Sequence, residues 1–459
     1  KTYIPSMAFA PDGRLFFTEK TTGAVRIMKE DKVLATPFVE ISNVHDTGEN
    51  GMLGITVDPD FTENHFVYLY YTHLDSKASQ PYNRLLRYTD NNGIGADMKV
   101  LLDKIPASPR GFHSGGALAF GPDDKLYITV GDSAIKKYAQ DVSSPNGKVL
   151  RINRDGSFPD DNPFPNSPVY TFGHRNMFGI AFNKSEKFGI VTENGHSHYD
   201  EVNMIEKGGN YGYPLQQPQD LNPALSNSSI KPVRSYWKNI APAQAIYYDG
   251  EKFPELKNKF LLASFLTGNL HALQFDEDNK EIIQEEVIRL NHDRPTISLA
   301  QSEDGSIYYG GKKMYVLETI DSTDKEEILY NLEITGAVDI KDLQLDKDEK
   351  MMVIDMYSQE SPSIVSIKIP KVVLDGVKFA FAVNEDGEET LINTEVDSSS
   401  LDHNVVDVNI PSNVSQLVIF GTSVIPEFPI FGIILILSLI FMIVTFLAKG
   451  KELVRLTIQ

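Results

Sequence analysis

The chain has 459 residues, of which 41% are hydrophobic, so it can bury one large core or several smaller ones. Its 63 Asp and Glu against 43 Lys and Arg give a formal net charge of −20 at pH 7. Because phosphate backbones are bound by cationic surfaces, this balance argues against a nucleic-acid partner. The chain contains no cysteine, which excludes disulfides, thiolate metal sites and cysteine nucleophiles.

Short runs rich in Val, Ile, Tyr and Phe begin near the N-terminus and recur along the chain, separated by turn residues. One unit repeats: an Asp-Gly or Asp-Asp pair, typical of a tight hairpin, followed by an alternating strand. It is found in APDGRLFFTE from Ala10, GPDDKLYITVGD from Gly121 and SEDGSIYYGG from Ser302. This recurrence favours the blades of a β-propeller over the alternative, an array of β-sandwiches. We therefore predict an all-β fold with a propeller over residues 1–368.

The sequence changes character near Ile369. Residues 369–424 are predicted to form a small β module that acts as a stalk. Residues 425–459 are predicted to form one transmembrane helix with a short tail, and Pro426 and Pro429 stiffen the approach to it.

Residues 430–448 form an apolar run of about 19 residues, long enough to cross a hydrocarbon core as one helix. A buried globular helix is the alternative, but the run is apolar on every face. Lys449, Lys451 and Arg455 follow, and the positive-inside rule places them in the cytoplasm. We therefore expect a single-pass protein of the cell membrane, with an extracytoplasmic propeller and a cytoplasmic C-terminus.

Two further patterns agree with an exterior location. Asn183, Asn227 and Asn413 begin N-x-Ser sequons, which predict a glycoprotein. The Pro-Glu-Phe triplet before the apolar run is similar to archaeal C-terminal sorting signals, some of which are cleaved and replaced by a lipid. The sequence leaves cleavage open, and either anchor would allow association with other membrane proteins.

Four segments carry a resemblance to a known family. They are GENGMLGITVDPDF from Gly48, FHSGGALAFGPDDKLYITVGD from Phe112, SSPNGKVLRINRDGSFPDDNPF from Ser143, and FGHRNMFGIAF from Phe172, which continues to TENGHSHYDEVNMIEKGGNYGYP. In this order and spacing they resemble the soluble sugar dehydrogenases that depend on pyrroloquinoline quinone (PQQ). The resemblance implies a six-bladed propeller that oxidises the C1 hydroxyl of an aldose by hydride transfer to the quinone, which an external electron acceptor reoxidises.

The resemblance also implies roles for individual residues. His113 is the base that takes the proton of the sugar hydroxyl, a task that suits an imidazole near neutral pH. Asp132 orients this imidazole and stabilises its charged form. Arg175 holds a carboxylate or quinone oxygen as an electrostatic clamp.

Other matching positions concern the cofactor and Ca²⁺. The cofactor-binding set is Glu49, Asn176, Asn194, Asp200 and Arg294. The set for Ca²⁺ is Gly195 and His196, through their backbone carbonyls, with Glu201 and Tyr211 at a second, structural position. For Glu201 and Tyr211, ordinary turn polarity is an equal alternative.

The chain departs from the family pattern at several contacts. Phe178 stands where the family commonly has a Gln, Leu266 where some members have a Lys, and Thr296 where a second Arg is usual. His196 stands where Pro is usual. A charged hydrogen bond is worth roughly 1.5 to 3 kcal/mol, so losing two would weaken binding of a tricarboxylate on the order of 100-fold or more.

Two hypotheses follow. The first is a membrane-anchored, PQQ- and Ca²⁺-dependent aldose dehydrogenase. The second is a propeller that has lost the cofactor and binds carbohydrate or protein at the cell surface. Residues in the site, rather than the scaffold, decide between them.

Overall fold

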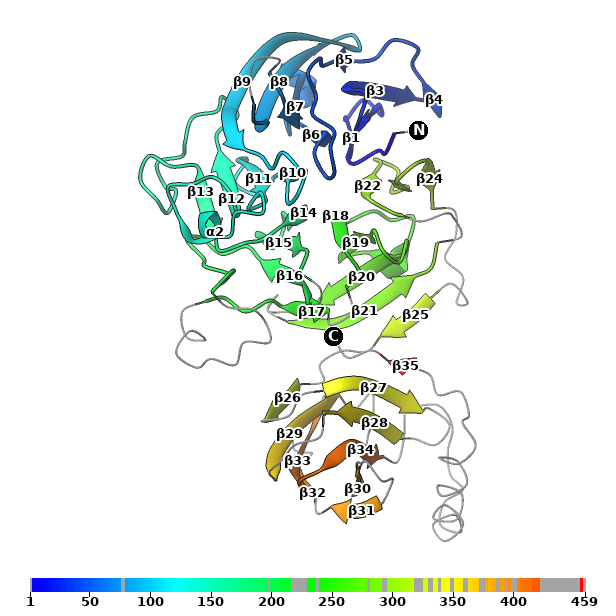
Figure 1. The fold of residues 1–459 in the computed structure, drawn as a ribbon. Coiled ribbons are helices and arrows are strands. Elements are labelled where there is room, and N and C mark those ends of the chain that lie inside the picture. The colour runs from blue at the N-terminus through cyan, green and yellow to red at the C-terminus, as the bar shows by residue number, and fades with distance from the viewer. Residues whose placement is uncertain are drawn as a thin grey trace. The chain divides into compact units, whose positions relative to one another are not determined.

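Figure 1 presents the computed structural model of the chain. It describes residues 2–75, 79–196, 199–215, 229–236, 239–276, 278, 281–290 and 295–317, shorter stretches from 325 to 421, and residues 455 and 456. The chain divides into two compact units, 1–327 and 328–458, with the last residue assigned to the first.

The described residues of the first unit form six antiparallel sheets. The first has strands β1 (Met7–Phe9), β2 (Leu15–Thr18), β3 (Ala24–Lys29), β4 (Lys32–Val33) and β5 (Val39–Glu40). The second has β6 (Met52–Val57), β7 (Phe66–His73), β8 (Tyr82–Asn91) and β9 (Ile94–Pro106). The third has β10 (Gly115–Phe120), β11 (Leu126–Val130), β12 (Lys148–Ile152) and β13 (Val169–Phe172).

The other three sheets follow in chain order. The fourth has β14 (Met177–Asn183), β15 (Phe188–Glu193), β16 (Asp200–Met204) and β17 (Arg234–Tyr236). The fifth has β18 (Pro242–Tyr248), β19 (Lys259–Ser264), β20 (Leu270–Phe275), β21 (Ile282–Ile288) and β25 (Lys325–Ile328). The sixth has β22 (Ser298–Gln301), β23 (Ile307–Gly310) and β24 (Met314–Val316). Three short helices lie between strands: α1 (Phe61–Asn64), α2 (Lys137–Gln140) and η1 (Pro254–Leu256).

The six sheets surround a common centre, as Figure 1 shows. The innermost strands β1, β6, β10, β14, β18 and β22 each contact the next, and β22 contacts β1. The backbone N–H of Ile4 donates to the carbonyl of Gly311 at 2.7 Å and so joins the N-terminal segment to the sixth sheet. The propeller-like arrangement predicted from the repeated hairpin is confirmed.

The predicted turns lie at equivalent places in the ring. They join β1 to β2, β10 to β11 and β22 to β23, so each connects an innermost strand to its neighbour. Gly13 and Gly305 have φ of +82° and +80°, and Asp124 has φ of 57°, backbone conformations that Gly and Asp tolerate best. The same turn residues therefore recur because these three sheets make the same turn between their first and second strands.

Apolar side chains fill the space between successive sheets. Tyr68 and Tyr70 of the second sheet pack with Phe120 and Ile128 of the third in one buried cluster. Another cluster joins the fourth and fifth sheets. Burial on both faces explains why many strands are continuously hydrophobic rather than alternating, and it makes the ring a rigid support for loops at its ends.

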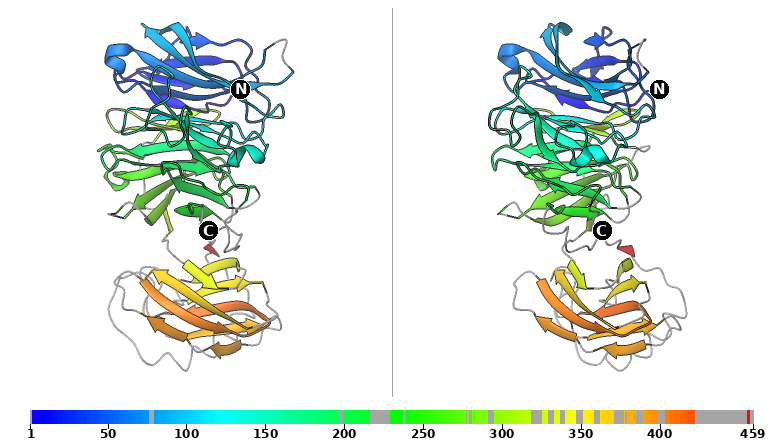
Figure 2. Two further views of the ribbon diagram at one scale, coloured as in Figure 1. Left: turned by 90° about the vertical axis from the view of Figure 1, so that its left-hand side faces the viewer. Right: turned by 60° about the vertical axis from the view of Figure 1, so that its left-hand side comes forward.

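The second unit consists of two sheets. One has the order β26 (Glu333–Gly336), β29 (Ser363–Pro370), β33 (His403–Ile410) and β32 (Thr394–Asp397). The other has β31 (Glu389–Ile392), β30 (Phe379–Asn384), β34 (Val414–Phe420), β28 (Met351–Met356), β27 (Ile340–Asp346) and β35 (Arg455–Leu456). Figure 2 shows them as facing layers, and a buried cluster that includes Ile367, Val406, Ile354 and Leu417 lies between them.

The structure differs from the sequence prediction in where the first unit ends. Strands β27, β28 and β29 belong to the second unit, so the boundary lies at Glu327 rather than at 368. Strand alternation shows that a segment is a strand but does not show which sheet it joins. In the part of the chain that is described, no helix is both long and apolar enough to cross a membrane; the predicted span at 430–448 lies outside the described residues.

Candidate active site

The candidate residues gather at one end of the ring. Glu49, His113 and Arg175 lie just before the innermost strands β6, β10 and β14, while Asp132 and Asn194 follow the second strands β11 and β15. In an antiparallel pair the start of one strand lies beside the end of the next, and Gly115 accordingly pairs with Val130. The ring thus brings together loops that are far apart in the sequence.

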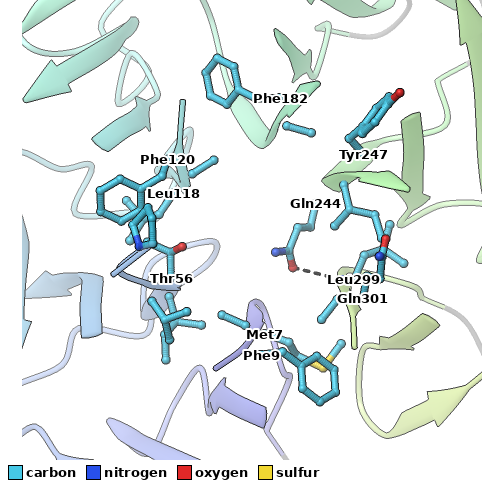
Figure 3. Close-up of a pocket in the computed structure, with 18 of the residues that line it drawn as sticks. Met7, Phe9, Thr56, Leu118, Phe120, Phe182, Gln244, Tyr247, Leu299 and Gln301 are labelled. Carbon is cyan, nitrogen blue, oxygen red and sulfur yellow. Dashed lines mark hydrogen bonds between the residues drawn. The ribbon is translucent and has the colours of Figure 1, made fainter. Parts of the chain in front are cut away.

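A hollow of about 510 Å³ lies at the opposite end of the ring, where the innermost strands end. Figure 3 shows Met7, Phe9, Thr56, Leu118, Phe120, Phe182, Gln244, Tyr247, Leu299 and Gln301 around it. None of the predicted site residues lines it. The candidate site and this hollow are therefore separate features.

His113 and Asp132 form a tight pair. The imidazole Nδ1 lies 2.5 Å from Asp132 Oδ1, and the carboxylate is fully buried while the His113 side chain keeps 14% of its surface exposed. A Cβ on Gly131 would lie 2.2 Å from the His113 carbonyl oxygen, so only glycine permits this approach. Since an ionised carboxylate only accepts, Nδ1 carries the proton and Nε2 is left to accept one. The predicted base and its orienter are brought together.

Glu49 and Asn176 meet at the mouth beside this pair. Glu49 Oε2 accepts from Asn176 Nδ2 at 3.2 Å and from the backbone N–H of Ser114 at 3.3 Å. Ser114 Oγ donates to Asn50 Oδ1 at 2.7 Å, and Asn50 is itself buried. Glu49 and Asn176 precede strands of different sheets, and the fold brings them together beside Ser114, the residue that follows His113. Their assignment to cofactor binding stays a prediction.

Arg175 is held by the segment that follows β15. Its Nη1 donates to the carbonyl of Asn194 at 2.7 Å, and its backbone N–H donates to Glu193 Oε1. Asn194 Nδ2 in turn donates to the carbonyl of Pro242 at 2.9 Å. The guanidinium is half-buried, so its remaining N–H groups are placed to bind an anionic or carbonyl oxygen.

The sequence analysis missed the pair formed by His174 and Glu193. His174 Nδ1 lies 2.8 Å from Glu193 Oε2, and both side chains are buried. His174 also stacks on Tyr211 with ring centroids 4.3 Å apart. The His in the GHRN motif was the available signal, but the partner is nearly twenty residues away and becomes visible only in the fold.

The carboxylate of Asp200 accepts hydrogen bonds from three backbone N–H groups. Oδ1 accepts from the backbone N–H of Gly195 at 2.8 Å, and Oδ2 accepts from those of Ile240 and Ala241 at 2.8 and 2.7 Å. Burial raises the pKa of Asp200 against these hydrogen bonds and the charge of Arg175. The carboxylate therefore fixes the loops around the site, and its assignment as a cofactor contact stays a prediction.

The residues assigned to Ca²⁺ are only partly brought together. Glu201 lies directly across the sheet from Glu193, and burial together with that neighbouring carboxylate raises the pKa of Glu201 to about 8. Tyr211 donates its hydroxyl to the Met204 carbonyl and accepts from the Glu206 N–H. This hydroxyl is therefore committed within the protein.

Gly195 and His196 were assigned through their backbone carbonyls, and that assignment stays a prediction. The His196 side chain is exposed. Among the described residues, no group of three or more His, Asp or Glu side chains is arranged to hold a metal ion. The arrangement does place two acidic side chains, Glu193 and Glu201, beside one another, where a cation would relieve their repulsion.

Three of the four departures from the family pattern, those at Thr296, Leu266 and Phe178, lie in different environments. Thr296 is buried and its Oγ1 donates to the Gly268 carbonyl at 2.7 Å. Leu266 has 47% of its surface exposed, and Phe178 is half-buried on β14. Arg294, the remaining predicted cationic contact, lies outside the described residues. The described part of the site thus offers Arg175 as its main cation.

Several buried polar atoms around the pair have no hydrogen bond of normal geometry among the described residues, although the Tyr213 hydroxyl lies beside Asp132 and Arg175. They are Asp132 Oδ2, Arg175 Nε and Asn176 Oδ1. Buried polar atoms are rarely left unpaired, so such a group of them indicates a site for a polar ligand. Two acceptors and a guanidinium donor fit a ligand that carries carbonyl or carboxylate oxygens together with hydroxyl groups, as PQQ and a sugar would provide.

The comparisons with known proteins identify the family of the chain. A family model described as Glucose / Sorbosone dehydrogenase matches residues 3–313. The chain belongs to this family. Quinoprotein glucose dehydrogenase B of Acinetobacter calcoaceticus is 36% identical over 239 residues, which cover 46% of this chain and 49% of that protein. Aldose sugar dehydrogenase YliI of Escherichia coli is 27% identical over 293 residues, 60% of this chain and 78% of that protein.

Two further matches define the breadth of the glucose/sorbosone dehydrogenase family. The structure of the PQQ-bound aldose sugar dehydrogenase of Streptomyces coelicolor aligns with a TM-score of 0.60, covering 69% of this chain and 95% of that one at 24% identity, and so shares the fold. Human Hedgehog-interacting protein is 30% identical over 190 residues, 35% of this chain and 27% of that protein. Family membership therefore covers proteins named as enzymes and one named for an interaction.

Proposed function

We propose that this chain is a PQQ- and Ca²⁺-dependent aldose dehydrogenase with a six-bladed propeller, displayed outside the cell by a C-terminal anchor. The observation that carries the proposal is the His113–Asp132 pair, in which Nδ1 binds the buried carboxylate and the backbone N–H of Asp132 donates to the Arg175 carbonyl at 2.8 Å. The names of its quinoprotein and aldose dehydrogenase relatives support the reaction class.

The residues of the chain divide the task as follows. His113 Nε2 would take the proton of the sugar C1 hydroxyl and so act as the general base. PQQ, when bound, would supply the two-electron oxidation that turns the C1 hydroxyl into a carbonyl. Asp132 holds Nδ1–H and stabilises the imidazolium that forms.

The other residues would hold the ligands. Arg175 would bind a carboxylate or quinone oxygen, and Asn176 and Glu49 would orient the sugar hydroxyls at the mouth. Ca²⁺ would bind the carbonyls of Gly195 and His196 and attract negative charge toward the reacting oxygen.

A second candidate function is a surface-binding module without cofactor. Leu266 and Thr296 favour it, because neither supplies the charge that a tricarboxylate needs. The relative named for an interaction also supports it.

The test is reconstitution of the full chain in detergent with PQQ and Ca²⁺, followed by dye reduction with a panel of aldoses. We expect turnover, its loss in His113→Ala, and retention of PQQ binding in that variant. His65→Asn is the matched control, because His65 is exposed, far from the site in its sheet, and has a φ of 57° that Asn accepts. Turnover that survived in His113→Ala would refute the assigned base, and absence of PQQ binding in the wild type would favour the surface-binding module.

A further inference from the structure

Lys148, at the start of β12, is a buried cation beneath the site. Its side chain has no exposed surface. The ammonium donates to three backbone carbonyls, those of Tyr138, Ala139 and Asn146, at 2.6, 2.9 and 2.7 Å. Burial lowers the pKa of Lys148 to about 7. Three carbonyl acceptors oppose this effect, because an ammonium has three N–H donors and a neutral amine only two.

Asn146 links Lys148 to the catalytic pair. The carbonyl of Asn146 accepts from Lys148, and its Nδ2 donates to the Gly131 carbonyl at 3.1 Å and to Ser133 Oγ at 3.0 Å. These two acceptors flank Asp132, which binds His113. A chain of hydrogen bonds thus runs from the Lys148 ammonium through Asn146 to Gly131 and Ser133, the two residues on either side of Asp132.

The charge of Lys148 also acts on the pair. No carboxylate among the described residues lies within ion-pair distance of its Nζ, and Asp141 and Asp132 favour its charged form from farther away. Electrostatic coupling is reciprocal, so the ammonium favours the ionised form of Asp132. Among the described residues, Lys148 and Asp141 interact electrostatically with each other, and Lys148 also with Asp132. Tyr213 and Arg175 lie beside Asp132. Glu49 accepts from the backbone N–H of Ser114, next to His113.

We propose that Lys148 is a positioning residue of the active site, which fixes Asp132 through Asn146 and lowers the proton affinity of the His113–Asp132 pair by its charge. A neutral imidazole is the form that accepts a proton, so this cation keeps His113 ready to act at lower pH. The inference rests on the proposed function only in calling His113 the base. The effect of the Lys148 charge on the His113–Asp132 pair does not require the cofactor and can be measured on the protein alone.

The test uses Lys148→Gln in the full chain without cofactor. Gln keeps N–H donors for the carbonyls but removes the charge. The protonation of His113 is followed by NMR of ¹⁵N-histidine-labelled protein, with the signal assigned by its loss in His113→Asn. We expect the titration midpoint of His113 to rise by about one pH unit. Lys137→Met is the control, because Lys137 is exposed on α2 and solvent screens its charge; it should leave the midpoint unchanged.

An unchanged midpoint in folded Lys148→Gln would overturn the electrostatic part of the proposal. If circular dichroism shows that Lys148→Gln does not fold, Asn146→Ala takes its place, since it keeps the ammonium and removes the link. Positioning through Asn146 predicts that the strongly downfield Nδ1 proton of the short His113–Asp132 hydrogen bond weakens or disappears in Asn146→Ala. Persistence of that signal would overturn the proposal.

Activity gives an independent readout. In reconstituted Lys148→Gln, the acid limb of kcat/KM against pH should move upward with the NMR midpoint, whereas a merely structural defect would lower turnover at every pH. A wild type that binds no PQQ would defeat the proposed function and leave the NMR shift standing. The two failures are therefore distinguishable.

Discussion

Replacing Asp132 by Asn removes one charge from the centre of the site and almost no volume. The carboxylate is fully buried and lies 2.5 Å from His113 Nδ1, and it also accepts from the backbone N–H of Ala134 at 2.8 Å. An Asn in this place can still form hydrogen bonds, but it cannot neutralise an imidazolium. The substitution therefore isolates the electrostatic contribution of the orienting residue.

The size of the effect follows from this geometry. An opposite charge at hydrogen-bond distance raises the pKa of a base by about 1 to 3 pH units, which corresponds to about 1.4 to 4 kcal/mol. Removing it should destabilise the imidazolium that forms when His113 accepts the proton, the opposite of the effect expected for Lys148→Gln. Because the imidazolium forms as the proton moves, turnover should fall about 10²- to 10⁴-fold.

The assay is the NMR titration of His113 in Asp132→Asn, combined with dye-linked kcat/KM between pH 5 and 9. We expect a lower titration midpoint and an acid limb that moves to lower pH. A midpoint that stays or rises, or turnover within threefold of wild type, would refute the claim that Asp132 stabilises the charged base.

Three other changes test different parts of the structure. Glu285→Gln should cost about 3 kcal/mol or more in urea unfolding, because Glu285 is fully buried and accepts from Arg234 Nε at 3.0 Å. Burial and Glu193 raise the folded-state pKa of Glu201 to about 8, so the folded protein holds this proton more tightly than the unfolded chain. In Ca²⁺-free buffer, stability should therefore fall as pH rises from about 4.5 to 8. Glu201→Gln should flatten this slope of Tm against pH. Leu266→Lys should tighten PQQ binding about 10-fold or more in a fluorescence titration, because a charged hydrogen bond is worth about 1.5 to 3 kcal/mol.

Each of these has a contradicting outcome. For Glu285, the matched control is Glu251→Gln in the exposed Lys257–Glu251 pair, which should change little; equal effects in both variants would refute the role of burial. A pH slope of Tm that is the same in Glu201→Gln and wild type would show that another group titrates. Unchanged PQQ affinity in Leu266→Lys would show that residue 266 does not face the cofactor.

The sequence predicted those features that depend on short local patterns. The Asp-Gly turns identified equivalent corners of the ring, and the FHSGG and VGD motifs identified His113 and Asp132, which the fold joins. The hydrogen bond between Glu49 and Asn176 was not predicted, because nothing local connects residues that precede strands of different sheets.

What the sequence could not provide depends on tertiary packing. Lys148 in the GKVLRI run is indistinguishable from a surface lysine until the fold shows three carbonyls around it. The hydrogen bonds of Asp200 also depend on the fold, because its Oδ2 accepts from backbone N–H groups of a distant loop. The boundary at Glu327 was missed because a strand pattern does not show which sheet the strand joins.

Binding of PQQ by the full chain, measured by calorimetry in the presence and absence of Ca²⁺, tests the central claim most directly. We expect one PQQ to bind per chain and to bind more weakly without Ca²⁺. In Arg175→Ala we expect a smaller enthalpy of PQQ binding than in the wild type. Absence of measurable PQQ binding under either condition would contradict it and leave a propeller whose His113–Asp132 pair serves another ligand.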